Sequence, residues 1–252
     1  EDRAGIEQAL EQEPVSNLNF RYVDLPRSLR PLLKIQGGHQ LYYYLWQLKA
    51  YFVARRLHKD TRFDLFHHIT YANDWMASFI GALLPIPYVR GPGGGAHRTP
   101  KGFDREYSLG GRLWEKVRSL GQWLFRHDPA FVKGQSRARA ILVCNQEALS
   151  GMPIRWAHKA QLFPVYGVSS GDLVLGGEAR APDGQFRVLS AGALIRIKGF
   201  SLALRAFKEF SEKYPSSEFK IIGSGPEESR LKAIVKRGQL HPKVQLLREV
   251  PR

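Results

Sequence analysis

Cysteine is almost absent from this sequence, with Cys144 as the single example in 252 residues. One thiol cannot form an internal disulfide, and a zinc site built from several cysteines is excluded. Long hydrophobic runs are missing as well. Because no stretch of about 18 consecutive apolar residues occurs, the sequence predicts no transmembrane helix.

Acidic residues are scarce relative to basic ones. The chain has 38 Lys and Arg against 23 Asp and Glu, which gives a formal net charge of +15. A surplus of this size predicts anionic partners, such as nucleic acid, acidic lipid headgroups or phosphorylated small molecules. Charge alone does not choose among these three classes.

Short apolar strands alternate with amphipathic helices along the chain. The last part shows this most clearly, with strands predicted at Phe186–Ser190, Glu218–Ile222 and Val244–Leu247. Helices over Ser201–Lys213 and Pro226–Arg237 separate them. This order predicts a parallel sheet with right-handed crossovers, and hence an α/β fold.

The same alternation is expected in the first two thirds. Strands are predicted at Asn19–Val23, Asp64–His67, Tyr88–Val89, Ala140–Cys144 and Gln161–Val165, and helices at His39–His58, Trp75–Leu84, Leu109–Phe125 and Pro129–Arg139. Glycine and proline then gather before Phe186. We therefore expect a first domain over residues 1–170, a linker over 171–185 and a second domain over 186–252.

Two loops of the second domain carry phosphate-binding chemistry, because ligands of open parallel sheets bind at the carboxyl ends of strands. In the loop after Ser190, Gly192 permits close ligand approach, while Arg196 and Lys198 offer cations beside a helix N-terminus. Gly223 and Gly225 predict an anion-binding turn after the next strand. The alternatives are a solvated basic loop and a tight turn.

Two further segments of the first domain are candidates. The run Arg90–His97 contains Gly91, Gly93, Gly94 and Gly95, which favours a ligand-binding loop over a flexible spacer. His68 follows a predicted strand and could act as a general base or hydrogen-bond donor; the alternative is a buried histidine of the core. No carboxylate or thiol stands at ligand spacing from it, so no metal is expected.

The segment Arg27–Arg62 interleaves basic and aromatic residues. It could rest on an anionic membrane surface or stack against a single-stranded nucleic acid. The third interpretation is an amphipathic helix with one core face and one solvated basic face. No recognisable nucleic-acid motif accompanies it, so nucleic acid is the disfavoured partner.

Several of these motifs together resemble the family-4 retaining glycosyltransferases. The similar segments are Val188–Phe200, Leu204–Phe207, Phe219–Glu227 and Val244–Arg252, and, in a bacterial subgroup, His67–Tyr71 and Pro87–Gly95. The resemblance implies a GT-B fold, with two Rossmann-like domains. It also implies retaining transfer from a nucleotide-sugar donor to a glycan or lipid-linked acceptor, without a metal or other cofactor.

The resemblance also implies roles for single residues. Lys198 would neutralise the donor diphosphate as it leaves, and Gly192 and Arg196 belong to the same site. Gly223 and Gly225 would lie beside the nucleotide. His68 and the glycine-rich loop from Gly91 to Gly95 would face the acceptor, and the enzyme would work in the cytoplasm, peripherally at the inner face of the plasma membrane.

The sequence departs from the family pattern at two positions and at both ends. Ala193 stands where the family commonly has arginine, and Ala96 where the subgroup often has an acid. The first strand and the later motif with paired glutamates have no counterpart here. We therefore expect an internal fragment that is inactive alone, although its parent protein is a transferase. A non-catalytic nucleotide-sugar-binding relative stays open, whereas a nicotinamide-dependent dehydrogenase is disfavoured because Glu228 replaces the third glycine.

Overall fold

The chain folds into two compact units, unit 1 over Glu1–Val168 and unit 2 over Ser169–Arg252. The computed structural model describes residues 3–35, 37–69, 73–95, 102, 107, 109–165, 167 and 184–248. Each unit holds a sheet whose strands are all parallel and are connected through helices, which confirms the predicted α/β class. Of the predicted linker, only Gly184 and Gln185 fall within the described residues.

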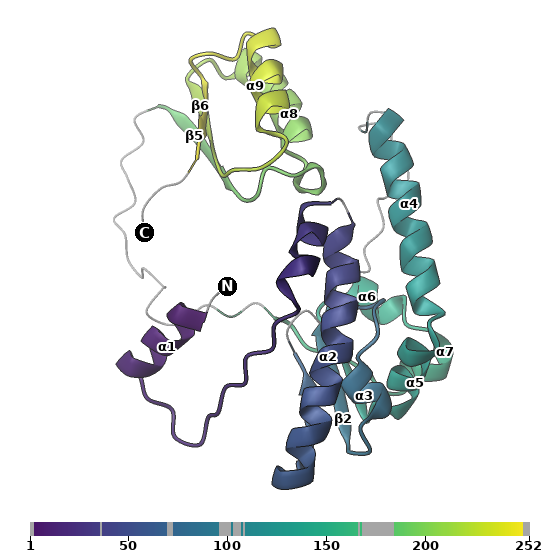
Figure 1. Ribbon diagram of the computed structural model, residues 1–252. Helices are drawn as coiled ribbons and strands as arrows, with labels where there is room; N and C mark the ends of the chain where they lie inside the picture. Colours follow the sequence, from purple (N-terminus) through teal and green to yellow (C-terminus); the bar gives the residue numbers. More distant parts are fainter. Residues whose placement is uncertain are drawn as a thin grey trace. The chain divides into compact units, whose positions relative to one another are not determined.

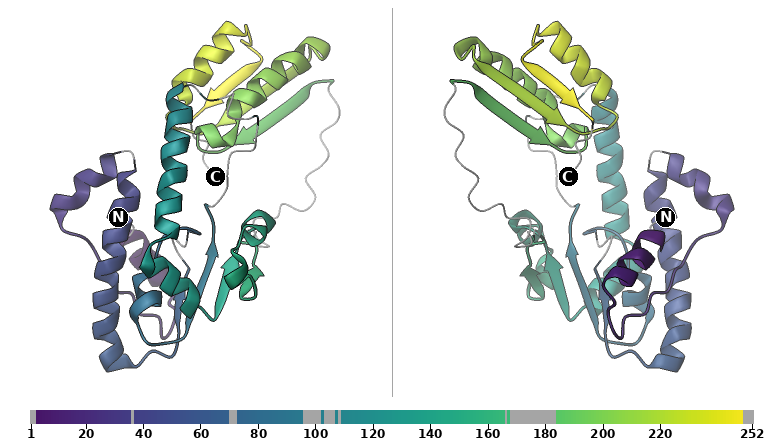
Figure 2. Two further views of the ribbon diagram at one scale, coloured as in Figure 1. Left: turned by 90° about the vertical axis from the view of Figure 1, so that its right-hand side faces the viewer. Right: turned by 90° about the vertical axis from the view of Figure 1, so that its left-hand side faces the viewer.

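Unit 1 is built on a four-stranded sheet in the order β1-β2-β3-β4. The strands are β1 Phe66–His68, β2 Tyr88–Gly93, β3 Ala140–Val143 and β4 Ala160–Leu162. The helices are α1 Arg3–Gln12, η1 Arg27–Lys34, α2 Gly38–Thr61, α3 Phe79–Leu83, α4 Leu109–Arg126, α5 Pro129–Arg137, α6 Gln146–Ser150 and α7 Ile154–Ala157. Figures 1 and 2 show the two long helices α2 and α4 of this unit, with the sheet beside their lower parts.

Aromatic side chains fill the core of unit 1. Tyr88 on β2 is 1% exposed, and Phe66 on β1 stacks on it with ring centroids 5.4 Å apart. Phe131 of α5 meets Trp156 of α7 edge to face. Gly81 lets α3 lie directly on Tyr88, because a Cβ there would come within 2.5 Å of the tyrosine ring. Burial of such large rings contributes to the stability of this unit.

Unit 2 is a smaller repeat of the strand-helix pattern. Its sheet has the order β5-β6-β7, with β5 Phe186–Ala191, β6 Ser217–Ile222 and β7 Val244–Leu247. The connecting helices are η4 Arg196–Lys198, α8 Phe200–Lys213 and α9 Glu228–Arg237. Figure 1 shows α8 and α9 on the same face of the sheet, as two crossovers of one hand require. Leu204, Ile221 and Val235 are fully buried between the helices and the sheet.

Several predicted elements of unit 1 are wrong or shorter than expected; the strand predicted at Gln161–Val165, for example, ends at Leu162. Asn19–Val23 forms no strand; Phe20 and Tyr22 stack on each other at 6.3 Å, and the Val23 carbonyl accepts a hydrogen bond from the Trp46 indole. The helix expected from Trp75 begins at Phe79 instead. Ser78 is its N-cap, accepting a hydrogen bond from the Gly81 backbone N–H at 3.3 Å.

The helix of the basic aromatic segment is α2, and it buries one side against unit 1. Tyr43, Gln47 and Ala50 are buried, whereas Arg55 and Arg56 are exposed. One side of α2 therefore faces the core and the other presents basic side chains to solvent, as the interpretation of this segment as an amphipathic helix predicts. Within the part of the chain that the structure describes, no helix combines the length and the apolar character needed to cross a bilayer.

Candidate functional site

The two phosphate-binding candidates of unit 2 lie at one edge of its sheet and are bonded to each other. Parallel strands β5 and β6 end side by side, with Ala191 paired to Ile222. Beyond them the Leu194 N–H donates to the Ser224 carbonyl at 2.8 Å, and the Glu227 N–H donates to the Leu194 carbonyl at 3.0 Å. The loops that follow the two strands therefore form one surface.

Gly223 and Gly225 are placed by this contact between loops. An added Cβ at Gly223 would lie 2.0 Å from the Gly192 carbonyl oxygen, and one at Gly225 would lie 2.6 Å from the Leu194 carbonyl oxygen. Both contacts are with backbone atoms, which cannot swing aside. The glycines thus let two backbones touch, so their placement has a structural reason that holds with or without a ligand.

Arg196 is engaged within unit 2. Its Nε donates to Glu227 Oε1 at 3.2 Å, and Arg230 bonds the other oxygen of the same carboxylate at 2.8 Å. The Glu227 side chain is only 12% exposed. The carboxylate offsets part of the positive charge that the sequence assigned to this loop, and Arg196 does not present an isolated cation to a phosphate.

Lys198 is differently placed. It ends the single turn η4, its side chain is exposed, and no hydrogen bond or ion pair of its ammonium is recorded within the described residues. Gly199 follows with φ +71° and precedes α8, which has no side-chain cap at its N-terminus. An exposed ammonium beside an uncapped helix start is chemistry that suits an anion.

The glycine run of unit 1 is not the loop that the sequence predicted. Gly91 and Gly93 belong to β2, and Gly93 pairs with Val143 after a register shift that begins at Arg90. Gly91 has φ +97°, and a Cβ there would lie 2.1 Å from the Leu142 carbonyl oxygen. The glycines thus allow β2 to bulge against β3, which is the physical reason that the strand continues through them.

The end of the glycine run meets the segment that follows β1. Gly94 forms a bridge with Asn73, and its carbonyl accepts from the Asp74 N–H at 3.0 Å. The Gly95 carbonyl accepts from the Gln122 amide of α4 at 3.2 Å. The neighbouring Ala96 lies outside the described residues.

His68 is at the end of β1 but lies inside the unit. It is 9% exposed, and its Nε2 lies 2.9 Å from the Tyr43 hydroxyl and 3.2 Å from the Gln47 amide nitrogen. These partners belong to α2 and are themselves buried. His67, beside it, has its Nε2 2.7 Å from the Gly91 carbonyl oxygen. The structure thus brings His68 together with core polar groups, and its catalytic role stays a prediction.

A cavity in unit 1 was not foreseen from the sequence. It has a volume of about 480 Å³ and lies between Asp74, the junction of α4 and α5, and the helices α6 and α7. Asp74 follows β1 and Glu147 follows β3, so the cavity is at the carboxyl edge of the sheet. Its lining residues are Asp74, Arg126, His127, Phe131, Gln135, Glu147, Ala148, Gly151, Met152, Pro153, Arg155 and Trp156.

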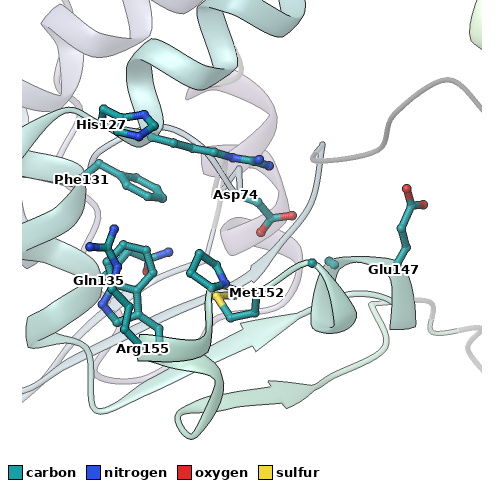
Figure 3. A pocket seen from close by; sticks show the side chains of 12 residues that line it. Asp74, His127, Phe131, Gln135, Glu147, Met152 and Arg155 are labelled. Atoms are coloured by element: carbon teal, nitrogen blue, oxygen red, sulfur yellow. The ribbon is translucent and has the colours of Figure 1, made fainter.

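The cavity combines aromatic walls with polar groups, as a sugar-sized ligand would need. Figure 3 shows Phe131 and Gln135 on one wall and Asp74 facing them from another. The Gln135 side chain is 3% exposed, and its Oε1 accepts no hydrogen bond among the described residues. Arg155 stacks over Trp156, with its guanidinium carbon 4.1 Å from the ring centroid. These residues are scattered over more than 80 positions, so no local motif could have revealed them.

No cluster of three His, Cys, Asp or Glu side chains that could hold a metal ion is found among the described residues. Cys144 directly follows β3, and its sulfur would lie 3.3 Å from a Cβ added to Gly94. Burial and the Asp74 carboxylate raise the pKa of its thiol, which makes it a poor nucleophile or metal ligand at neutral pH.

The comparison with protein families gives a match within the second unit. Residues 177–252 match the family model described as "Glycosyl transferases group 1". Over 49 residues the chain is 43% identical to an uncharacterized glycosyltransferase of Haemophilus influenzae, a stretch that covers 19% of this chain and 14% of that protein.

Two solved structures are similar over nearly half of the chain. One is a TarM mutant of S. aureus in complex with fondaparinux, α-GlcNAc-glycerol and UDP, with 10% identity and a TM-score of 0.38 over 48% of this chain. The other is the pneumococcal O-GlcNAc transferase GtfA in complex with UDP and GlcNAc, with 22% identity and a TM-score of 0.37 over 46% of this chain. The chain spans 23% of each of these proteins. The match to the family model shows that the segment 177–252 is similar to group 1 glycosyltransferases.

Proposed function

We propose that the protein to which this chain belongs is a GT-B retaining glycosyltransferase. It moves a sugar from a nucleotide-sugar to a glycan or lipid-linked acceptor, without a metal ion. The observation that carries this proposal is the joined pair of loops after β5 and β6, with exposed Lys198 beside the start of α8, inside the segment that matches group 1 glycosyltransferases.

Lys198 is the residue we assign to the donor diphosphate. As the bond to the sugar breaks, negative charge grows on the leaving phosphate, and a fixed ammonium stabilises that charge most where it develops. The N–H groups at the uncapped start of α8 act in the same direction. Gly192, Gly223 and Gly225 keep the backbone surface flat enough for the nucleotide to approach, and Arg196 serves chiefly to hold Glu227.

The acceptor side is assigned to unit 1. The aromatic cavity beside Asp74 is its main candidate, because aromatic faces and buried amide oxygens bind sugar rings and hydroxyls. The glycines from Gly91 to Gly95 hold the Asp74 segment against β2, so they shape this region without forming a mobile loop. His68 lies at the end of β1, the strand that precedes Asp74, and its Nε2 is held by Tyr43 and Gln47.

The proposal is tested by nucleotide-sugar turnover. The protein that contains this chain would be incubated with a panel of nucleotide-sugars, and release of nucleoside diphosphate would be followed. We expect turnover of one nucleotide class by the whole protein and none by the 252-residue chain alone. Turnover of no donor by the whole protein would overturn the proposal.

A non-catalytic relative is the second candidate, and the state of Arg196 favours it. Ala193 cannot supply the cation that family-4 enzymes commonly carry, and Arg196 is bonded to Glu227. Such a protein would bind a nucleoside diphosphate without releasing one from any nucleotide-sugar. Binding measured by calorimetry beside the turnover assay separates the two functions.

A further inference from the structure

A second cavity of unit 1 lies at the opposite edge of its sheet from the cavity beside Asp74. It has a volume of about 640 Å³ and is formed where α3, α5 and α7 turn into the strands β2, β3 and β4. It is therefore at the amino ends of these strands, and is here named the amino-edge cavity. The two cavities share no lining residue.

The charged side chains that line the amino-edge cavity are basic. Arg137 and Arg139 come from the end of α5 and the turn into β3, whereas His158 and Lys159 come from the turn between α7 and β4. Among the described residues, no Asp or Glu lines this cavity. Its apolar wall is the segment 85–87, which has two prolines and an isoleucine. A cavity with this balance of charge attracts anions.

Two of the cations also satisfy the ends of helices. The Lys159 ammonium donates to three backbone carbonyls at the C-terminal end of α5, at 2.6 to 3.2 Å. Arg137 donates to the carbonyls of Gly81 and Leu84, at the C-terminal end of α3. Helix C-termini carry partial negative charge, which would repel an anion. Because Lys159 and Arg137 cover these carbonyls, much of that repulsion is offset.

Arg139 and His158 complete the positive surface. Both residues are exposed, and neither side chain has a hydrogen bond or ion pair within the part of the chain that the structure describes. Burial and the charge of Arg139 lower the pKa of the Lys159 ammonium. The lowered pKa shows that the two cations repel each other, and a bound anion would relieve this repulsion.

We propose that the amino-edge cavity binds a small molecule that carries a phosphate or diphosphate group. Arginine donates paired, charge-assisted hydrogen bonds to such oxyanions, and Arg139 is the residue placed to do so. Cavities of this size hold more than a bare phosphate, so the apolar wall is available to the rest of the ligand. The site lies in unit 1 and its ligand is bound without sugar transfer, so the inference does not depend on the proposed donor loops of unit 2.

The experiment is calorimetric titration of the chain with inorganic pyrophosphate, with sodium chloride of equal ionic strength as the blank. The double variant Arg139→Gln/His158→Gln should weaken pyrophosphate binding at least about tenfold, because it removes charge-assisted hydrogen bonds. Lys159 stays in place, so the end of α5 keeps its partner. The matched control His39→Gln/Arg56→Gln removes the same two residue types from exposed positions of α2 and should bind like the wild type.

Lys198→Ala separates this site from the loops of unit 2, since it should retain the binding that Arg139→Gln/His158→Gln loses. Circular dichroism would show that each variant is folded. The proposal is overturned if the wild type does not bind pyrophosphate, if Arg139→Gln/His158→Gln binds it as tightly, or if the control loses as much affinity. Binding to phosphatidylglycerol vesicles without binding to pyrophosphate would also overturn it, because the cations would then contact a lipid headgroup.

Discussion

Gly223 shows how one residue ties the two loops of unit 2 together. In Gly223→Ala the new methyl group would lie 2.0 Å from the Gly192 carbonyl oxygen, so the two loops must separate. We expect a loss of about 2 kcal/mol or more in the free energy of unfolding. Gly199→Ala is the control, because its φ is also positive but no atom lies within 4 Å, and it should cost only about 1 kcal/mol. Urea unfolding measures both; equal losses would contradict the loop contact.

Cys144 gives a prediction about pH. Burial is the larger cause of its raised thiol pKa, and Asp74 adds to it. Because the folded thiol holds its proton more tightly than the unfolded one, this contribution to stability is present below the unfolded pKa of about 8.5 and is lost as pH rises above it.

The same thiol can be followed by its reaction rate. We expect Cys144 in the folded chain to react with a disulfide reagent at pH 8 at least about tenfold more slowly than in urea. Asp74→Asn should speed the folded reaction, since it removes the carboxylate that disfavours the thiolate. A folded rate equal to the rate in urea would contradict the raised pKa.

The C-terminal end of helix α5 is capped by Lys159, which lies later in the chain. The Lys159 ammonium donates to the carbonyls of Gln135, Ser136 and Ala138, at 3.2, 2.6 and 3.0 Å. A cation at a helix C-terminus satisfies carbonyls that have no partner in the helix. Lys159→Met should therefore cost about 2 kcal/mol of unfolding free energy. Lys133→Met, on an exposed lysine of the same helix, should cost less than about 0.5 kcal/mol, and thermal unfolding of both variants checks the difference.

The elements that the sequence predicted best are those with a strong local period. The strands and helices of unit 2 agree with the structure within a residue or two, because each strand is apolar and each helix ends near a glycine or proline. Asn19–Val23 has the composition of a strand, yet no strand of the described residues pairs with it. The glycines from Gly91 to Gly93 continue a strand because β3 requires a bulge there, a reason that only the pairing reveals.

Periodicity also predicts a helix without telling which side of it is buried. The leucine spacing of α4 indicated a helix correctly, whereas the outward direction of those leucines depends on Gln122 and Phe125 contacting unit 1. Likewise, the cavity beside Asp74 joins residues from five segments of unit 1. Such arrangements follow from packing between elements, so they could not be predicted from local sequence.

At the scale of the whole molecule, two features stand out. Residues 177–252 match group 1 glycosyltransferases, and unit 1 holds an aromatic cavity. The charge of +15 suits the proposed donor, because a phosphorylated nucleotide-sugar is attracted to a cationic surface.

The most direct test of the proposed transferase is the turnover of Lys198→Ala in the whole protein, compared with Lys213→Ala. Both lysines are exposed, and Lys213 ends the helix that Lys198 precedes. If Lys198 stabilises the leaving diphosphate, its loss should lower kcat roughly 100-fold while Lys213→Ala stays near the wild type. Equal turnover by the two variants, with both still folded, would contradict the central assignment.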